Sequence, residues 1–459
     1  GVDEESLAHD VEVLLALWRE IEHNGKIQSA PCLLYRDLDW ADLVMIGGML
    51  PQQRDAMRVM ARAQARGRPV VIGGPDVTSS PDVYAAAEFR VLGEAEGILA
   101  EFIAAWSGGV KRGVFTAPGF PDLKTSPSPR FDLLKFEHYL HVGVQFSRGC
   151  PFNCEFCNVI ELNGRVPRFK TPEQMLGELE ALHALGYRGH VDFVDDNLIG
   201  NPGAARPFLA ALGRWNAQRG RPFEFSSEAS LNLADSDELL TLMREAGFFA
   251  VFVGIETPDT QALLDARKLQ NARRDIVASV RRIHRAGIAV NAGFILGFDA
   301  ETGSMGQIMT DFIEDLAVPV CMVGLLYALP ETQLSRRLLR EGRLHPGSDR
   351  LLEEGDADQC TSGLNFVTRR SRREILEDYR GILSRIYAPA AFFGRIRRLN
   401  REIAYNRRRQ PPPFRSQARD LRAFARITWQ LGCRDREVRA EYWKTVAACL
   451  FLKIGRAHV

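Results

Sequence analysis

The sequence predicts an α/β fold in two successive parts, followed by a mostly helical region. Three observations support this prediction. From residue 38 to about residue 330, short apolar runs alternate with amphipathic segments, and such alternation is typical of parallel sheets covered by helices. Four prolines between residues 118 and 129 interrupt the alternation and predict a linker, here taken as residues 118–141. Residues 331–459 have a helical pattern, which the prolines at 411–413 divide into two blocks.

The first part, residues 1–117, has the pattern of a doubly wound sheet. Apolar runs at residues 43–48, 69–75 and 89–97 each end in glycines, and residues 52–66 predict a helix between the first two. Ligands of such sheets bind beyond the carboxyl ends of the strands, where glycine lets a bulky group approach the backbone. Residues 3–22 predict an acidic amphipathic helix, and no strand is predicted before residue 38.

The second part, residues 142–330, contains six strand-then-helix units. Because eight such units close a barrel, six predict an open, partial barrel with a mouth wide enough for a large substrate. The predicted strands are 142–147, 190–194, 223–227, 248–255, 289–298 and 320–328, and the predicted helices include 172–184, 204–218, 236–245 and 273–285.

The C-terminal region is strongly basic, although the whole chain has a formal net charge of only +1. Residues 369–459 contain 23 Lys or Arg against 8 Asp or Glu. This asymmetry indicates an anionic partner, either a membrane surface or nucleic acid, or else a basic helical face that is solvated or packs on the acidic body. One predicted helix surrounds apolar residues with arginines. Its apolar residues include Phe392, Phe393, Ile396, Leu399 and Ile403, and its arginines are Arg395, Arg397, Arg398, Arg401, Arg407, Arg408 and Arg409.

Three of the eight cysteines lie close together, at Cys150, Cys154 and Cys157. Three thiolates in one short loop can ligate three irons of a four-iron cluster, and no fourth cysteine lies nearby to hold the remaining iron. The alternatives are a chance cluster or a zinc site, but zinc favours four ligands in a pair-plus-pair pattern that the chain does not contain. The scattered cysteines are predicted to be buried, inert thiols: Cys32, Cys321, Cys360, Cys433 and Cys449.

Polar residues follow several of the predicted strands of the second part. Each alone has an alternative interpretation as a turn or a helix cap. Together they lie at the carboxyl ends of the strands, on the same rim as the cysteine loop, where barrels of this kind have their active sites. These strand-end candidates are Asp195, Asp196, Asn197, Glu228, Glu256 and, as a weak catalytic candidate, Tyr327.

With these motifs in order, residues from about 40 to 330 resemble the cobalamin-binding radical S-adenosylmethionine (radical SAM) family. The phrases Gly73-Gly74-Pro75, Leu92 to Gly97, Phe193 to Asn197 and Val253 to Glu256 are typical of it, as is the C-x-x-x-C-x-x-C spacing of the cysteines. The C-terminal third resembles a helical region in the branch that includes the hopanoid C-2 methylase. The resemblance implies a Rossmann-like cobalamin-binding domain, a partial (β/α)6 radical SAM barrel and this helical region.

The resemblance also implies three cofactors, namely a 4Fe–4S cluster, SAM and cobalamin. The open iron would chelate SAM, while carboxylates suit its ammonium and ribose and a glycine strand edge suits its adenine. The SAM site would comprise Phe156, Asp195, Asp196, Asn197, Glu228, Glu256, Gly293 and Ile295. The cobalamin site would comprise Gly47, Gly48, Gly73, Gly74, Pro75, Thr78, Gly93, Glu94 and Glu96. The chain lacks Asp-x-His-x-x-Gly, so no histidine is expected on cobalt.

The activity that the resemblance implies is methyl transfer to an unactivated carbon, for which a lipid such as a hopanoid is one expected substrate. Two alternatives remain, namely a cobalamin-dependent radical reaction without methylation and a tRNA methylthiotransferase-like activity, although the second N-terminal three-cysteine site of the latter is missing. A non-enzymatic cofactor sensor is a minor alternative. The expected partners are a small-molecule or lipid substrate, an electron donor such as flavodoxin or ferredoxin, and an anionic membrane surface rather than nucleic acid. The expected location is the cytoplasm, peripheral to the inner membrane.

Overall fold

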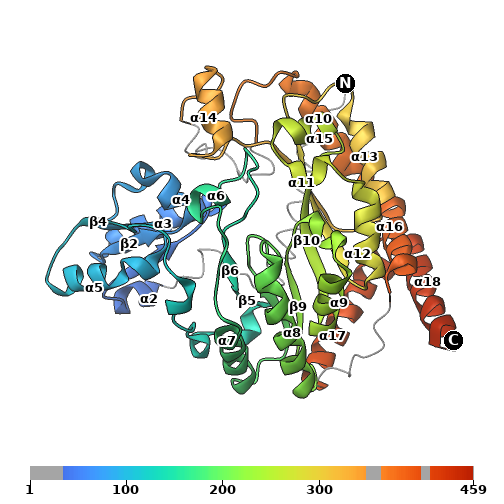
Figure 1. The fold of residues 1–459 in the computed structure, drawn as a ribbon, viewed down its shortest axis with the longest axis horizontal. Helices are drawn as coiled ribbons and strands as arrows, with labels where there is room; N and C mark the ends of the chain where they lie inside the picture. Colours follow the sequence, from blue (N-terminus) through green and yellow to red (C-terminus); the bar gives the residue numbers. More distant parts are fainter. Residues whose placement is uncertain (1–34, 348–362, 405–413, 458–459) are drawn as a thin grey trace. The chain divides into compact units, whose positions relative to one another are not determined.

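The computed structural model describes residues 35–347, 363–404 and 414–457 (Figure 1). These residues form two compact units. The N-terminal unit comprises residues 35–121 and 129–142, and the C-terminal unit comprises residues 122–128 and everything described from residue 143 onward. The predicted helix at 3–22, the prolines at 411–413, Cys32 and Cys360 lie outside the described residues.

The N-terminal unit is built on a parallel sheet of four strands in the order β1-β2-β3-β4. The three strands predicted in this region are confirmed, and β4 was missed because its short run contains only two large apolar residues, Val114 and Phe115. Its elements are α2 (Tyr35–Trp40), β1 (Val44–Gly47), α3 (Gln53–Gln64), β2 (Val70–Gly73), α4 (Pro75–Ser79), β3 (Phe89–Leu92), α5 (Leu99–Ser107) and β4 (Gly113–Thr116).

Alternation along β2 builds a core on each face of this sheet. Val70 and Ile72 point to one face, where they pack with Met60 of α3, while Val71 points to the other and packs with Phe102 of α5. All three strand residues are fully buried, as expected of a sheet covered by helices on both faces. The two covered faces leave only the strand ends open, which is where the predicted glycine loops lie.

The C-terminal unit contains a six-stranded open sheet in the order β12-β11-β10-β9-β8-β5. The strand pairs from β8 to β12 are parallel, and the six predicted strands are confirmed within a few residues. β11 ends two residues earlier than predicted because Gly297, at φ +106°, turns the chain away. The strands are β5 (Val142–Val144), β8 (Gly189–Phe193), β9 (Phe223–Glu228), β10 (Phe248–Glu256), β11 (Ala289–Leu296) and β12 (Cys321–Leu325), and a separate hairpin pairs β6 (Ser147–Arg148) with β7 (Arg168–Phe169).

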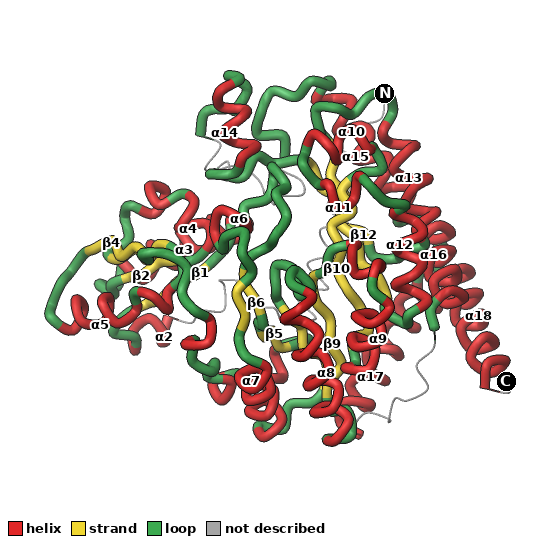
Figure 2. Tube along the Cα trace, in the orientation of Figure 1, coloured by secondary structure: helices red, strands yellow, loops and turns green. Residues whose placement is uncertain are grey.

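Helices connect these strands (Figure 2), and capping residues fix where some of the helices begin. Thr171 and Gln174 form a capping box at the start of α7, and Asp275 caps α12, which therefore begins three residues later than predicted. The helices are α6 (Val159–Leu162), α7 (Pro172–Ala184), α8 (Pro202–Gln218), α9 (Asp237–Ala246), α10 (Thr260–Asp265), α11 (Leu269–Ala272), α12 (Ile276–Arg285) and α13 (Met305–Leu316).

A helical region follows β12, as predicted. Within it α15 packs on α13 and α16 packs on α18. Among the described residues, no helix has the length and apolarity needed to cross a membrane. Cys433 is exposed, so the prediction that every scattered cysteine is buried is wrong at this position. The helices are α14 (Gln333–Arg340), α15 (Arg372–Ile386), α16 (Pro389–Glu402), α17 (Phe414–Ile427), the π-helix η9 (Thr428–Arg434) and α18 (Arg439–Ala457).

The basic helix predicted around Arg395 is α16, and it packs on the body of the C-terminal unit. Arg395 is fully buried and donates hydrogen bonds to the Val318 and Ile386 carbonyls and to Glu314. Arg398 also binds Glu314, and the Arg397 guanidinium lies 2.9 Å from the Glu441 carboxylate. These three arginines therefore bind groups within the C-terminal unit, and the expectation that they face a membrane is wrong. Arg401 is exposed, and Arg407, Arg408 and Arg409 lie outside the described residues.

Candidate active site

The three cysteines lie in one loop that connects strand β6, the first strand of the β6–β7 hairpin, to helix α6. Cys154 is buried, while Cys150 and Cys157 are partly exposed. Burial raises the pKa of the Cys150 and Cys157 thiols, so binding of a metal group would have to release their protons. Among the described residues, no three His, Cys, Asp or Glu side chains gather around one point as a single metal ion requires. Sulfurs that ligate three different irons need no such convergence.

Two aspartates at the end of β8 hold the start of this loop. Asp195 is buried and accepts hydrogen bonds from the Phe146 amide at 3.0 Å and from the amide and hydroxyl of Ser147. Asp196 accepts from the Gly149 amide at 2.8 Å and from the Asn163 side chain at 3.0 Å. Both residues thus support the loop, and their predicted contact with SAM remains a prediction.

Gly149, immediately before Cys150, has a conformation that other residues rarely adopt. Its φ is +94°, and a Cβ atom there would lie 2.9 Å from the carbonyl oxygens of Asn163 and Gly164. The chain can turn into the cysteine loop at this point only because the side chain is absent. Asn197, two residues after Asp195, is also buried, and its side-chain amide donates to the Ser230 hydroxyl at 3.0 Å.

A second acidic group lies at the ends of β8 and β9. The protein that surrounds the Glu228 carboxyl group, followed by the negative charges of Asp192 and Asp196, raises the pKa of Glu228 to about 8. Asp192 accepts a hydrogen bond from Ser226, which also contacts the His190 ring at 2.7 Å. Neighbouring carboxylates that disfavour one another's charge form a site that attracts a cation.

We expect the affinity for SAM to rise as the pH increases through about 8, because Glu228 is mostly protonated below that value. Once ionised, its carboxylate would attract the SAM ammonium. The matched control is Glu228→Gln, whose side chain cannot ionise. This variant should lose the rise in SAM affinity near pH 8 that Glu228 causes, but should keep any change in affinity that comes from titration of SAM itself. Equilibrium binding across this range measures both proteins. Identical pH profiles would remove Glu228 from the SAM site.

The end of β10 carries a buried ion pair that the sequence did not predict. The Lys268 Nζ atom lies 2.5 Å from a carboxylate oxygen of Glu256, and both side chains are buried. Burial alone would lower the pKa of Lys268, but the charge of Glu256, aided by the Cys154 sulfur, outweighs that effect and raises it. Lys268 therefore stays charged. Its Nζ atom is 5.7 Å from the centre of the Phe156 ring in the cysteine loop.

The segment after α10 thus reaches the cysteine loop. Besides Lys268, the Gln270 amide lies 3.5 Å from the Cys154 sulfur, and the Glu155 amide donates to the Ala266 carbonyl at 3.0 Å. These residues were missed because they follow a short helix rather than a strand. The available signal was the group of polar residues Lys268, Gln270 and Asn271 shortly after α10.

Two glycines leave space on the surface of the sheet beside the Glu256–Lys268 ion pair. Gly254 of β10 pairs with Gly293 of β11. A Cβ atom on Gly254 would lie 3.0 Å from the Lys268 Nζ atom, and one on Gly293 would lie 3.0 Å from the Phe252 ring. Ile295 lies on the same, less buried face as Gly293, because side chains alternate along β11. Tyr327 is buried two residues after β12.

Residues of helix α14 also form hydrogen bonds with the cysteine loop. Arg337 makes two hydrogen bonds to the carboxylate of Glu155, at 2.7 and 3.2 Å, and Gln333 donates to Asn153 at 2.8 Å. Arg337 also binds Asp299, which in turn binds Arg343. A charged network therefore connects the loop to the helical C-terminal region.

The predicted glycine loops of the N-terminal unit come together at one edge of its sheet. Gly74 has φ +103°, and a Cβ atom there would lie 3.1 Å from the Gly48 carbonyl. The Thr78 hydroxyl donates to the Gly74 carbonyl and accepts from the Gly93 amide, both at 2.9 Å, so it joins the loops after β2 and β3. Gly47 and Gly73 end β1 and β2, Pro75 begins α4, and Glu94 and Glu96 follow β3.

Two family models and several known proteins are similar to this chain in sequence. A family model of the radical SAM superfamily matches residues 144–312, and a domain of unknown function, DUF4070, matches residues 332–458. An uncharacterized methyltransferase of Synechocystis sp. is 40% identical over 88% of this chain and 74% of its own length. The hopanoid C-2 methylase of Rhodopseudomonas palustris is 37% identical over 89% of this chain and 76% of its own length.

Solved structures share the fold at low sequence identity. The radical SAM methyltransferase TsrM from Kitasatospora setae, with cobalamin and a 4Fe–4S cluster bound, is 18% identical with a TM-score of 0.59, covering 70% of this chain and 72% of its own. The cobalamin-dependent radical enzyme OxsB, with aqua-cobalamin and SAM bound, is 16% identical with a TM-score of 0.58, covering 94% of this chain and 69% of its own.

The open parallel sheet and the three-cysteine loop define a radical SAM enzyme. The chain belongs to the radical SAM superfamily, in the family that includes the hopanoid C-2 methylase of Rhodopseudomonas palustris.

Proposed function

We propose that this protein is a cobalamin-dependent radical SAM methyltransferase that acts on an unactivated carbon of a lipid such as a hopanoid. The observation that carries the proposal is the 37% identity to the hopanoid C-2 methylase across 89% of the chain, including the helical C-terminal region. A bound 4Fe–4S cluster would supply the electron that cleaves SAM, and bound cobalamin would carry the methyl group.

The residues of the C-terminal unit suit the cluster and SAM in distinct ways. Cys150, Cys154 and Cys157 would hold the cluster, while the aspartates after β8 keep their loop in shape. Glu228 offers a carboxylate for the SAM ammonium. Glu256, held by Lys268, offers a second polar contact, and the Gly254–Gly293 pair leaves a flat face for the adenine.

Product analysis tests this function. The full-length protein, reconstituted anaerobically with cluster and cobalamin, would be given SAM, a reductant and a hopanoid. We expect S-adenosylhomocysteine and 5′-deoxyadenosine together with a methylated lipid. 5′-Deoxyadenosine without S-adenosylhomocysteine would favour the non-methylating radical alternative. Intact SAM in the loaded protein would contradict both and favour a sensor.

We also propose that cobalamin lies against the glycine loops that follow β1, β2 and β3, with no histidine on cobalt. In the described part of the N-terminal unit, the only histidines are His138 and His141, and neither belongs to these loops. We expect the electron paramagnetic resonance spectrum of the cob(II)alamin form to lack nitrogen splitting from a histidine ligand. Such splitting in the wild-type protein would contradict the proposal.

A lipid substrate would be met at a membrane surface, and α17 supports such a contact better than α16 does. Leu421 and Phe424 lie three residues apart on α17, Trp429 follows in η9, and all three are more than half exposed. Arg422 and Arg426 are exposed beside them. A basic helix with exposed apolar residues lies well at an anionic bilayer, where each Lys or Arg contributes about 1 kcal/mol.

Vesicle co-sedimentation measures this membrane contact. We expect salt-sensitive binding to anionic vesicles by the full-length chain and a clear loss of binding in Leu421→Glu/Phe424→Glu. The matched control is Leu376→Glu, which adds a negative charge at an exposed leucine of α15 and should bind normally. Equal binding by the double variant and this control would exclude α17 from the membrane contact. No binding at low salt would remove the membrane from the proposal.

A further inference from the structure

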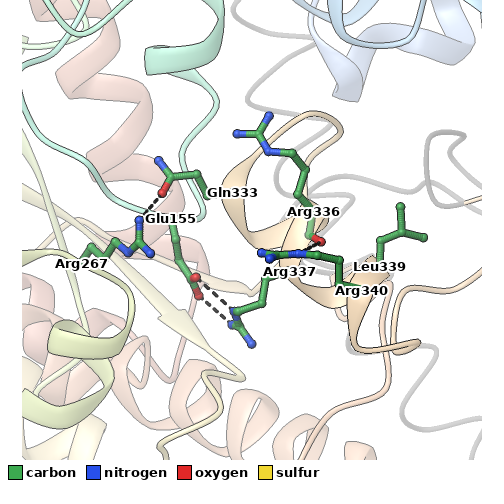
Figure 3. Close-up of a pocket in the computed structure, with 7 residues that line it drawn as sticks. All are labelled: Glu155, Arg267, Gln333, Arg336, Arg337, Leu339 and Arg340. Carbon is green, nitrogen blue, oxygen red and sulfur yellow. Dashed lines mark hydrogen bonds and ion pairs between the residues drawn. The ribbon is translucent and has the colours of Figure 1, made fainter.

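A pocket of about 490 Å³ opens between helix α14 and the back of the cysteine loop (Figure 3). Its lining contains four arginines but only one carboxylate. The lining residues are Glu155, Arg267, Gln333, Arg336, Arg337, Leu339 and Arg340.

Two of these arginines have no carboxylate partner among the residues that the structure describes. Arg337 is bound to Glu155, and Arg336 is bound to Glu161 at 2.7 Å. Arg267 instead contacts the uncharged Gln333 at 2.6 Å, and Arg340 contacts the Arg336 carbonyl at 3.2 Å. Within the described ranges, neither Arg267 nor Arg340 has a carboxylate partner, and both are exposed. The rim of the pocket is therefore positive.

The pocket also presents one apolar side chain. Leu339 lies next to Arg340 on α14 and is 67% exposed. Arginine is enriched in protein–protein interfaces, where exposed apolar side chains become covered. A small anion would gain nothing from Leu339, whereas a protein partner could cover it.

The pocket also lies directly behind the metal-binding loop. Glu155, which forms part of its wall, is the covalent neighbour of Cys154. The Glu155 backbone is fixed on both sides, since its amide binds Ala266 and its carbonyl accepts from the Leu334 amide at 2.8 Å. If a partner bound at Leu339, helix α14 and Glu155 would lie between that partner and the cysteine loop.

We propose that this arginine-rimmed pocket is the docking surface for a small acidic one-electron carrier protein of the flavodoxin or ferredoxin type. The proposal rests on the proposed radical SAM function, which requires an electron. The reduced carrier would give one electron to a 4Fe–4S cluster held by Cys150, Cys154 and Cys157, and would then leave in its oxidised form. Complementary charge would raise the encounter rate and make it sensitive to salt.

The test uses a purified acidic flavodoxin and three full-length proteins. These are the wild type, Arg267→Gln/Arg340→Gln, and Arg436→Gln as a matched control at an exposed arginine outside the pocket. Binding to the cluster-free proteins is followed by flavin fluorescence at low and high salt. SAM cleavage by the reconstituted proteins is then measured against reduced flavodoxin concentration and, separately, with dithionite.

We expect the double variant to need about tenfold more flavodoxin for binding and for half-maximal SAM cleavage, with a weaker salt dependence. Its rate with dithionite, which needs no docking surface, should match that of the wild type. The Arg436→Gln control should behave as the wild type in every measurement.

Unchanged flavodoxin binding in the double variant would overturn the proposal. So would binding of inorganic phosphate in the pocket without any binding of flavodoxin, which would make it a small-anion site. If the wild type fails to cleave SAM even with dithionite, the proposed function fails instead, and the fluorescence titration still decides whether the pocket binds the carrier.

Discussion

Replacing Cys150, Cys154 and Cys157 by alanine should reduce SAM cleavage to background and remove the iron from the reconstituted protein. Each single replacement should also abolish cleavage, because a cluster held by three thiolates has no spare ligand within the cysteine loop. Iron analysis and the visible spectrum measure the loss of iron, and 5′-deoxyadenosine formation measures the loss of SAM cleavage.

The matched control for this experiment is Cys433→Ala. Cys433 is an exposed free thiol outside the loop, so its loss should change neither iron content nor cleavage. Full iron content together with full activity in the triple variant would contradict the cluster assignment. Retained iron without activity would instead place the metal elsewhere in the chain.

Glu256→Gln should weaken SAM binding and also destabilise the fold, because it leaves the buried Lys268 without its partner. Removal of one member of a buried ion pair typically costs about 3–5 kcal/mol of unfolding free energy. Lys268→Met should cost a similar amount, because it leaves the Glu256 carboxylate buried and unpaired. Urea unfolding of the cluster-free chain measures the stability, and SAM binding to the reconstituted protein measures the site.

The double variant Glu256→Gln/Lys268→Met separates the two effects. With no unpaired charge left, it should recover much of the stability lost by either single variant. If Glu256 contacts SAM, the double variant should still bind SAM weakly. Recovery of both properties would restrict Glu256 to a structural role.

An exposed ion pair provides the control for these measurements. Arg206 and Glu238 lie 2.7 Å apart at the surface, with more than a third of each side chain exposed. Glu238→Gln should cost less than about 1 kcal/mol and leave SAM binding unchanged. A loss as large as that of Glu256→Gln would show that burial is not the cause of the effect.

The sequence alone determined the architecture and the position of the cysteine loop. Both depend on local patterns, because alternating apolar runs dictate which segments become strands and helices. Three cysteines within eight residues must lie in one loop whatever the rest of the chain does. Even the first and last residues of helix α7 could be predicted, since its capping residues Thr171 and Gln174 lie at its first turn.

Only the tertiary structure decided which charged residues act together. Lys268 and Glu256 are 12 residues apart, Arg337 and Glu155 are 182 apart, and nothing in their local sequence indicates the pairing. The same holds for Arg395, whose helix has the pattern of a membrane-facing surface but whose guanidinium is buried against Val318, Ile386 and Glu314. Amphipathic periodicity gives the face on which a side chain lies, whereas the partner that meets this face depends on how distant segments pack.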